Sequence, residues 1–482
     1  MSNKGSFYWH DYETFGTDPA RDRPAQFAGI RTDFDFNEIG EPLEVYCRSA
    51  NDFLPHPDAC LITGITPQDA INKGVVEAEF IKKIHAELMQ PNTCVVGYNS
   101  LRFDDEVTRN TLYRNFYDPY EREWRNGNSR WDLIDMVRLT RALRPEGIRW
   151  PDHPDGKPNF KLEQLTAANG IVHAQAHDAV SDVRATIEMA KLIKQKQPRL
   201  FDYVYSFRDK KKLQAKLNPE LAQPVIHVSG MYPAEKGCLA IILPIVCHPT
   251  NKNAVAVYDL SQQPSDLIDL SAEDIYRRIF TKVSDLKSGE MRIPLKLVHV
   301  NRCPIVVPLN TLRPADAERL SIDVESCMVN STVIQNNIRT ISAKVAEAFN
   351  QDYTDAPTDP DLMLYSGGFF SAHDKGLMQQ IRRTSVAELS ELHPTFDDVR
   401  LSAMLFRYRA RNYLDSLSDT ERGRWDEYRM KRIVGDDLAT NLSNADFTAR
   451  ITELEQSEGL SERNKSILSN LKEYEKQLVT GC

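Results

Sequence analysis

The chain has 482 residues, of which 41% are apolar, and a formal net charge of −9. One hydrophobic core rarely supports this length, so we expect two or three domains. The first residues lack an apolar signal segment, no run approaches 18 apolar residues, and the eight cysteines form no C-x-x-C pair. These features argue against secretion and membrane spanning, and favour a reduced, cytoplasmic protein.

The first predicted strand begins at residue 6 and ends in the carboxylates Asp11 and Glu13, and a turn is expected at residues 14–16. Alternate residues of a strand share a face, so these two side chains would point to the same side. The pattern alone has little weight, because Asp-x-Glu recurs elsewhere in the chain, at residues 104–106 and at Asp323 and Glu325. Such a pair is more often solvated at the surface than part of a site.

Strand-like runs and helical patterns alternate through residues 1–197. The pattern at residues 78–89 places its apolar residues on one helical face. Alternation of this kind predicts a mixed sheet flanked by helices, as in ribonuclease H-like folds. The other strand-like runs are residues 26–32, 43–47 and 94–98.

Residues 102–149 contain ten arginines and no lysine, although the whole chain is acidic. Binding to phosphates depends on such local clusters more than on total charge. Interleaved aromatics and arginines suit a groove where bases stack and guanidinium groups hold phosphates. The alternative is a helical hairpin with aromatics packed inward and solvated arginines. The residues concerned are Arg109, Arg114, Tyr117, Tyr120, Arg122, Trp124, Arg125 and Arg138.

A second acidic motif spans residues 99–104 and ends in Asp104, and a third runs from His177 to Asp182, where an apolar-periodic helical segment begins. With the first motif and Asp104, it supplies four carboxylates and one imidazole. Mg²⁺ prefers oxygen ligands, and two such ions about 3.5–4 Å apart need several converging carboxylates. His177 is not needed as a ligand for a hard metal. An imidazole suits proton transfer from an attacking water better.

The pattern changes after Pro198. Residues 224–308 are rich in strand-like runs, with a helical segment at 272–279, and residues 352–360 form a second break before a helical region. The basic-aromatic cluster at 407–411 is explained best as part of a packed amphipathic helix. Cys247 and His248 lack a second ligand pair at zinc spacing, so we do not predict a zinc site. Further strands are expected at 225–228, 240–243, 254–257 and 295–298, and helices at 399–413, 419–432 and 463–479.

The three acidic motifs resemble the Exo I, Exo II and Exo III motifs of the DEDD exonucleases that carry a histidine in the third motif. The segments 10–16, 99–110 and 142–148 resemble bacterial exonuclease I in particular. This resemblance implies a 3′→5′ exonuclease that degrades single-stranded DNA to 5′-mononucleotides with two Mg²⁺ ions, for which Mn²⁺ is a possible substitute. The implied metal ligands are Asp11, Glu13, Asp104 and Asp182, with His177 as general base.

The resemblance also implies the architecture and the contacts with DNA. We expect an α/β ribonuclease H-like exonuclease domain at 1–197, an SH3-like β-barrel domain with helical insertions at 198–350, and an all-α C-terminal domain at 353–482. Lys161 stands where the family member compared has arginine, which puts a two-pronged phosphate contact in doubt there. The implied substrate contacts are Glu13, Arg109, Tyr120, Trp124, Arg138 and Lys161.

A protein partner follows from the same resemblance. Exonuclease I enzymes bind the acidic, Phe-terminated C-terminal tail of the single-strand DNA-binding protein. The matching positions here are Arg144, Tyr203 and Arg313. Two arginines would meet the carboxylates of the tail while an apolar pocket takes the Phe ring.

We therefore predict a monomeric, processive exonuclease in the bacterial cytoplasm, associated with the nucleoid and acting in DNA repair and recombination. The alternatives are a DEDD exoribonuclease, a proofreading exonuclease or a non-catalytic single-strand-binding module. The long extension after residue 197 disfavours the first two, and five intact site residues disfavour the third. The region after Gln351 either retains the strand between steps or only covers apolar surface, and a truncation there would distinguish these readings.

Overall fold

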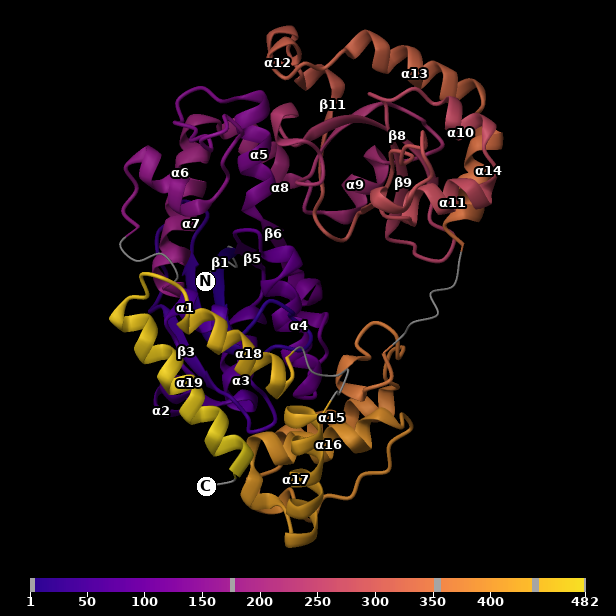
Figure 1. Cartoon of the computed structure of the whole chain (residues 1–482). Coiled ribbons are helices and arrows are strands. Elements are labelled where there is room, and N and C mark those ends of the chain that lie inside the picture. The colour runs from indigo at the N-terminus through magenta and orange to yellow at the C-terminus, as the bar shows by residue number, and fades with distance from the viewer. Residues whose placement is uncertain (1–4, 174–177, 351–356, 436–441, 481–482) are drawn as a thin grey trace. The chain divides into compact units, whose positions relative to one another are not determined.

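The computed structural model describes residues 5–173, 178–350, 357–435 and 442–480 (Figure 1). Its contacts divide the chain into two compact units. The first unit combines residues 1–129, 173–184 and 355–482, and the second combines residues 130–172 and 185–354. The C-terminal helical region therefore shares a unit with the first 129 residues, although it is far from them in the sequence.

The sheet of the first unit has the strand order β4-β3-β2-β1-β5-β6. Strand β1 lies inside it, antiparallel to β2 and parallel to β5, so the sheet is mixed as predicted. The chain enters the second unit within β6. The strands are β1 (Ser6–Thr14), β2 (Pro24–Thr32), β3 (Leu43–Arg48), β4 (Val75–Val76), β5 (Thr93–Gly97) and β6 (Ser129–Asp132).

Strand β1 carries Asp11 and Glu13, as the sequence predicted. It extends one residue further than expected, into the predicted turn, because β2 stays paired with β1 as far as Thr14. Asp11 and Glu13 therefore lie within a strand that is held along one edge. This backbone fixes the direction of both side chains more firmly than a turn would.

Four helices of the first unit follow the early strands. Helix α3 has the predicted apolar face, and its Phe80 and Ile84 pack against Tyr8 and Phe27 of the sheet. The burial of this face explains why α3 lies on the sheet. The helices are α1 (Pro57–Thr63), α2 (Pro67–Lys73), α3 (Glu77–Leu88) and α4 (Asp104–Arg114).

The C-terminal helices build two further cores with the early part of the chain. Leu468 and Leu471 of α19 pack with Leu54 and Cys60, beside α1 (Figure 1). Met404 of α16 belongs to a cluster that contains Tyr113 and Phe116. These helices are α15 (Ala372–Arg383), α16 (Arg400–Asn412), α17 (Asp419–Val434), α18 (Asn444–Glu455) and α19 (Glu462–Thr480).

A buried ion-pair network joins the same two parts of the first unit. Asp52 is fully buried, and one of its oxygens lies 2.8 Å from Arg411 and 3.3 Å from Arg432. Arg411 also lies 2.8 Å from Asp361. The basic cluster at 407–411 thus belongs to a packed helix, as predicted, and its arginines are paired with carboxylates, of which Asp52 and Asp361 are buried.

Asp52→Asn is expected to lower the free energy of unfolding by about 3–5 kcal/mol, because it leaves buried arginines without their counter-charge. Burial alone would raise the pKa of the Asp52 carboxyl, but Arg411, Arg432 and Arg23 together hold it below its usual range. Such a carboxylate stabilises the fold fully above about pH 4 and loses this effect as the pH falls toward its folded pKa.

Urea denaturation of both proteins at pH 7 and at pH values below 4 measures this difference. The gap between them should narrow in acid. Asp415→Asn is the control, because Asp415 is fully exposed and loses little. Equal unfolding free energies for wild type and Asp52→Asn at pH 7 would contradict the assigned role.

The second unit is built on a five-stranded sheet of order β10-β9-β8-β7-β11. Its neighbouring strands are antiparallel, and Ile242, Val257 and Val306 lie in its core. The four strands expected between residues 225 and 298 are all present, and β11 adds a fifth. They are β7 (Val225–Val228), β8 (Leu239–Cys247), β9 (Ala254–Asp259), β10 (Leu295–His299) and β11 (Ile305–Pro308).

The helices of this unit come before, between and after these strands in the sequence. Helix α11 falls where the helical segment was expected, and α7 begins in the first unit and continues in the second. The helices are α5 (Leu133–Leu143), α6 (Leu162–Asn169), α7 (Ala179–Lys196), α8 (Pro198–Ser206), α9 (Lys210–Lys216), α10 (Ser265–Asp269), α11 (Ala272–Phe280), α12 (Pro314–Arg319), α13 (Val324–Asn336) and α14 (Ile338–Ala348).

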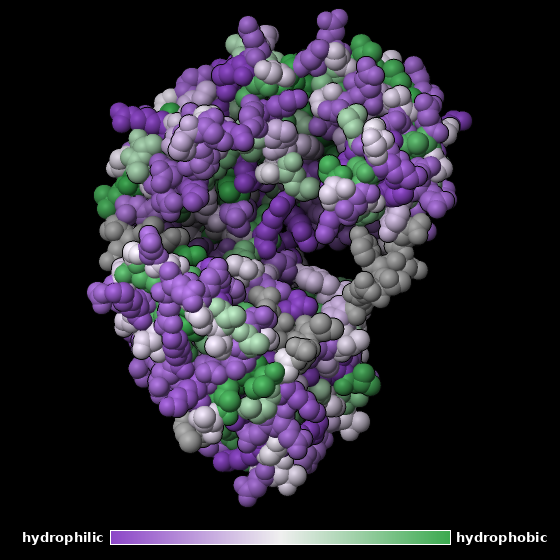
Figure 2. All heavy atoms as spheres, viewed as in Figure 1, coloured by the Kyte–Doolittle hydropathy of each residue, from purple (hydrophilic) through white to green (hydrophobic). Residues whose placement is uncertain are grey.

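The face in Figure 2 is mostly hydrophilic, with apolar residues in small scattered groups. Of the helices in the described ranges, none has both the length and the apolar character needed to cross a membrane. Most of the cysteines in those ranges are buried, and Cys247 is exposed. Among the described residues, Cys247 and His248 do not belong to a group of potential metal ligands.

Candidate active site

The sheet leaves room for a site beside the second half of β1. Strand β5 pairs with β1 from Ser6 to Trp9, and the chain then turns away at Gly97 toward α4. A Cβ atom at Gly97 would lie 2.4 Å from the Cβ of Ser100 and 3.3 Å from the carbonyl oxygen of His10. Glycine therefore permits the close turn that brings the start of α4 beside β1.

Asp104 is the first residue of α4, where exposed backbone N–H groups favour a negative charge. Its Oδ1 accepts a hydrogen bond of 3.1 Å from the backbone N–H of Tyr12, between Asp11 and Glu13. One turn later, the Thr108 hydroxyl donates to the Tyr12 hydroxyl at 3.0 Å. Helix α4 is thus attached to β1 at two points, which places the Asp104 carboxylate beside the other two.

Asp182 brings a fourth carboxylate from the first turn of α7. Asp11, Glu13 and Asp182 offer oxygen atoms that all lie within 4.8 Å of one another. Among the described residues, these three side chains form the group of potential ligands that is close enough to share a metal ion. A set made of carboxylate oxygens suits a hard divalent cation such as Mg²⁺.

The electrostatics of the site also fit a cation. Burial, reinforced by Asp104, Glu13 and Asp182, raises the pKa of the Asp11 carboxyl well above its usual range. Burial, reinforced by Asp182, Asp104 and Asp178, raises the pKa of Glu13 to about 8. Carboxylates this close repel one another unless positive charge lies between them. The predicted metal ligands are therefore arranged so that a divalent cation would stabilise their ionised forms.

A histidine that the sequence analysis did not single out lies at this site. The Nε2 atom of His173 is 2.5 Å from Oδ1 of Asp182. The feature of the sequence that could have pointed to His173 is its position four residues before His177. His177 itself, the predicted general base, lies outside the described residues.

The predicted DNA contacts of the first unit differ in their exposure. The Arg109 guanidinium is buried and makes two hydrogen bonds, of 2.8 and 2.9 Å, to the Glu123 carboxylate, and one of 2.8 Å to Glu106. It lies 5.3 Å from the centre of the Tyr120 ring. The Trp124 side chain is 65% exposed and so is accessible for stacking on a base.

The other arginines of this stretch are largely neutralised. Arg114 pairs with Glu77 at 3.0 Å and Arg122 with Asp105 at 2.6 Å, both buried, while Arg125 pairs with Glu121. Tyr117 is buried in the core of the sheet. The alternative prediction was a hairpin with aromatics packed inward and solvated arginines. Tyr117 does pack inward, but most of these arginines form ion pairs and are not solvated.

Two predicted DNA contacts belong to the second unit. Arg138 of α5 lies 2.6 Å from Asp135 and stacks near Phe160, 5.8 Å from its ring centre. Lys161 caps the start of α6 and is exposed, 3.9 Å from Glu163. The ammonium group of Lys161 is thus open to an incoming phosphate.

The predicted partner residues also lie in the second unit. Arg144 and Arg313 both donate to the carbonyl oxygen of Leu143, and both lie near Asp316, at 3.8 and 2.6 Å. Arg313 also bonds to Glu146 at 2.8 Å. Tyr203 of α8 has its ring 4.7 Å from that of Phe207. The two arginines therefore converge on the same carbonyl oxygen and the same carboxylate.

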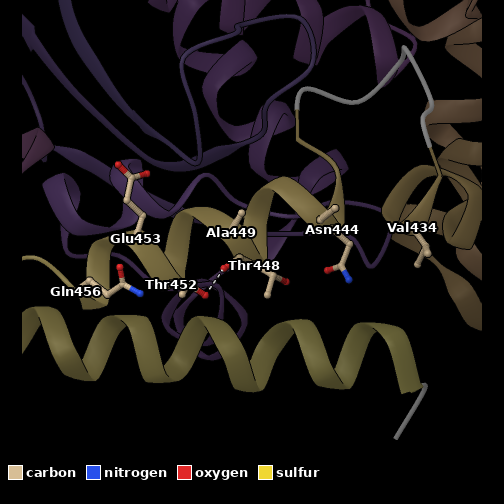
Figure 3. A pocket seen from close by; sticks show the side chains of 8 residues that line it. Val434, Asn444, Thr448, Ala449, Thr452, Glu453 and Gln456 are labelled. Atoms are coloured by element: carbon tan, nitrogen blue, oxygen red, sulfur yellow. Dashed lines mark hydrogen bonds between the residues drawn. The ribbon is translucent and has the colours of Figure 1, made fainter.

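Figure 3 shows a hollow lined by residues of α18, among them Asn444, Thr448 and Thr452, with Val434 at the end of α17. It contains none of the site residues described above. Asn444 and Val434 flank residues 436–441, which lie outside the described ranges. The hollow adds nothing to the carboxylate site.

The fold and the site together define a class of protein. A mixed sheet whose inner strand carries two carboxylates, with two more at the starts of helices, is the arrangement of a metal-dependent exonuclease. The chain matches three family models in order. They are described as exonuclease (residues 8–190), exonuclease I SH3-like domain (208–351) and exonuclease I C-terminal domain (358–478).

Individual relatives agree with these models. Exodeoxyribonuclease I of Escherichia coli is 49% identical over 434 residues, which cover 89% of this chain and 91% of the relative. The solved exonuclease I of Methylocaldum szegediense is 51% identical, with a TM-score of 0.95 over 98% of this chain and all of that one. E. coli exonuclease I with a dA16 oligonucleotide is 46% identical, with a TM-score of 0.94 over 98% and 100%. The chain belongs to the exodeoxyribonuclease I family.

Proposed function

We propose that this chain removes nucleotides one at a time from the 3′ end of single-stranded DNA, releasing 5′-mononucleotides. The observation that carries this proposal is the convergence of Asp11, Glu13 and Asp182 within 4.8 Å, with Asp104 bonded to the strand between them. Membership of the family supplies the reaction class. DNA repair and recombination are the setting in which the family acts.

We further propose that two Mg²⁺ ions are held by Asp11, Glu13, Asp104 and Asp182. A solved E. coli relative is described as the zinc-bound form of an exonuclease I–single-stranded DNA complex, so related sites accept a divalent ion. Bound divalent ions polarise the phosphate and favour deprotonation of water. The carboxylates hold this positive charge in place, and β1 and α4 fix their directions. His177 takes the proton of the attacking water, because an imidazole has an unperturbed pKa near 6.5.

The exposed Trp124 ring and the Lys161 ammonium group are proposed to hold the strand, by stacking and by phosphate contact. Arg109, Tyr120 and Arg138 are proposed to act at the same substrate, with Arg109 delivered in a fixed position by Glu123. Three sequence domains, 1–197, 198–350 and 353–482, are supported by the order of the three family models. We propose that the protein acts as a monomer.

End-labelled DNA tests the function. With Mg²⁺, a 5′-labelled single strand should shorten in one-nucleotide steps, and a 3′-labelled strand should release its label at once as a mononucleotide. Immediate release of the 5′ label would show that cleavage starts at the 5′ end instead. An RNA strand of the same sequence distinguishes an exoribonuclease, and binding without any release in all lanes would indicate a non-catalytic binding module.

We also propose a partner, the C-terminal tail of the single-strand DNA-binding protein, at Arg144, Tyr203 and Arg313. A solved relative, 44% identical with a TM-score of 0.90, is described as SSB/exonuclease I in complex with an inhibitor. The two arginines converge near Leu143, and both already contact Asp316. An acidic tail would replace these internal contacts, so its binding should weaken with salt.

An acidic peptide that ends in Phe is expected to bind the wild-type chain at low salt, and Arg144→Ala should weaken binding by at least about tenfold, since a charged hydrogen bond contributes roughly 1.5–3 kcal/mol. Fluorescence anisotropy of a labelled peptide measures this. Arg149→Ala is the matched control, because Arg149 is exposed and close in sequence. Equal affinity for wild type and Arg144→Ala would refute the assigned site.

A further inference from the structure

His173 contacts one of the proposed metal ligands from outside the carboxylate cluster. Its Nε2 atom lies 2.5 Å from Oδ1 of Asp182, and its side chain is 7% exposed, compared with 18% for Asp182. A carboxylate oxygen accepts hydrogen bonds, so the imidazole nitrogen is the donor here. Because water has little access to the pair, the contact is weakly screened and orients the carboxylate strongly.

The contact leaves Asp182 able to bind a cation. A carboxylate has two oxygens with several lone pairs, so Asp182 can accept a hydrogen bond from the imidazole and still offer an oxygen to a cation shared with Asp11 and Glu13. Asp182 lies in the first turn of α7, whereas His173 comes from the segment before that helix, nine residues earlier. The hydrogen bond therefore holds the side chain from a second backbone position. Asp11 and Glu13 are fixed by β1, and Asp104 by its bond to Tyr12.

We propose that His173 is a positioning residue that holds Asp182 in the direction needed to bind a divalent cation. This inference rests on the proposed function of the carboxylate cluster. Hydrogen-bond partners of metal ligands reduce the freedom that a ligand loses on binding, and their removal typically weakens metal affinity about 10–100-fold. His173 contributes its N–H group and its fixed ring, and takes no part in the reaction itself.

The experiment measures Mn²⁺ binding to the intact protein without DNA, by calorimetry or by the loss of the free-ion electron paramagnetic resonance signal. His173→Phe keeps a ring but removes the donor, and His173→Gln keeps an N–H donor without the ring. His173→Phe should weaken Mn²⁺ binding at least about tenfold, and His173→Gln should retain most of the affinity. His393→Ala is the control, because that histidine is exposed and should bind as wild type does.

A second readout separates positioning from catalysis. The Mg²⁺ concentration that gives half-maximal DNA hydrolysis should rise in His173→Phe, while the rate at saturating Mg²⁺ stays near wild type. Wild-type Mn²⁺ affinity in His173→Phe overturns the inference, and so does an affinity lower in His173→Gln than in His173→Phe. Circular dichroism of both variants checks their folding. If His173→Phe does not fold, a Mn²⁺ affinity of His173→Gln below a tenth of the wild-type value overturns the inference.

Asp11→Asn separates this failure from a failure of the proposed function. If Asp11→Asn loses Mn²⁺ binding while His173→Phe keeps it, the cation site stands and the role of His173 is wrong. If Asp11→Asn also binds Mn²⁺ as wild type does, the carboxylate cluster is not the cation site, and both proposals fall together.

Discussion

Asp11→Asn is expected to reduce the rate of single-stranded DNA hydrolysis by about 10³-fold or more. The carboxylate lies among Glu13, Asp104 and Asp182, and its loss removes one of the charges that would hold divalent ions in the site. Bound ions contribute several kcal/mol of transition-state stabilisation, and each 1.36 kcal/mol is about tenfold in rate. Single-turnover cleavage of a labelled strand at saturating Mg²⁺ measures the effect.

Binding of DNA by this variant should change little, because affinity for a single strand depends on stacking and phosphate contacts. Glu325→Gln is the control, from the exposed pair Asp323 and Glu325 with the same Asp-x-Glu pattern, and should cleave at the wild-type rate. His177→Ala offers an internal scale, with a loss of roughly 10²–10⁴ as for a general base. An Asp11→Asn enzyme within tenfold of wild type would remove the carboxylate cluster from the reaction.

Deletion of residues 442–482 is expected to unfold the first unit. Helix α19 buries Ile467, Leu468, Leu471, Tyr474 and Leu478 against the early part of the chain, around Phe15, Leu54 and Cys60. Large buried side chains each contribute about 2–5 kcal/mol, whereas a whole domain is stable by only about 5–15 kcal/mol. Thermal unfolding followed by circular dichroism should show that the cooperative transition of this unit is lost.

A point variant tests the same interface without deleting chain. Leu471→Ala should cost about 2–5 kcal/mol. Val399→Ala, at a side chain that is 90% exposed, should cost little. A truncated protein that remains folded, cleaves DNA and dissociates after few steps would instead favour the reading in which the C-terminal region retains the strand. Product length in the presence of excess trap DNA distinguishes these outcomes.

The carboxylates that the structure brings together could be found from the sequence, because each lies in a short local motif. Asp11 and Glu13 share a strand face, and Asp182 starts an amphipathic helix, so each could be found from a short pattern. The expected turn begins one residue late, because pairing with β2 extends β1 to Thr14, and no local pattern reveals such pairing.

Contacts between residues far apart in the chain could not be predicted from the sequence. The partner of Asp52 is Arg411, 359 residues later, and periodicity within α16 indicates burial but not the counter-charge. The same holds for Arg109, whose partner Glu123 changes it from an apparently solvated cation into half of a buried pair. His173 was passed over because a lone histidine carries little information until its neighbour in space is known.

The first unit is assembled from residues 1–129, 173–184 and 355–482. A ribosome delivers the first of these segments long before the last, at about 5–20 residues per second. The core around Phe15 and Cys60 therefore forms only after α19 has been synthesised. A nascent chain that has not reached α19 carries Asp11, Glu13 and Asp104 but lacks this supporting core. The order of synthesis thus delays the folding of the unit that carries the carboxylates until residues 355–482 have been made.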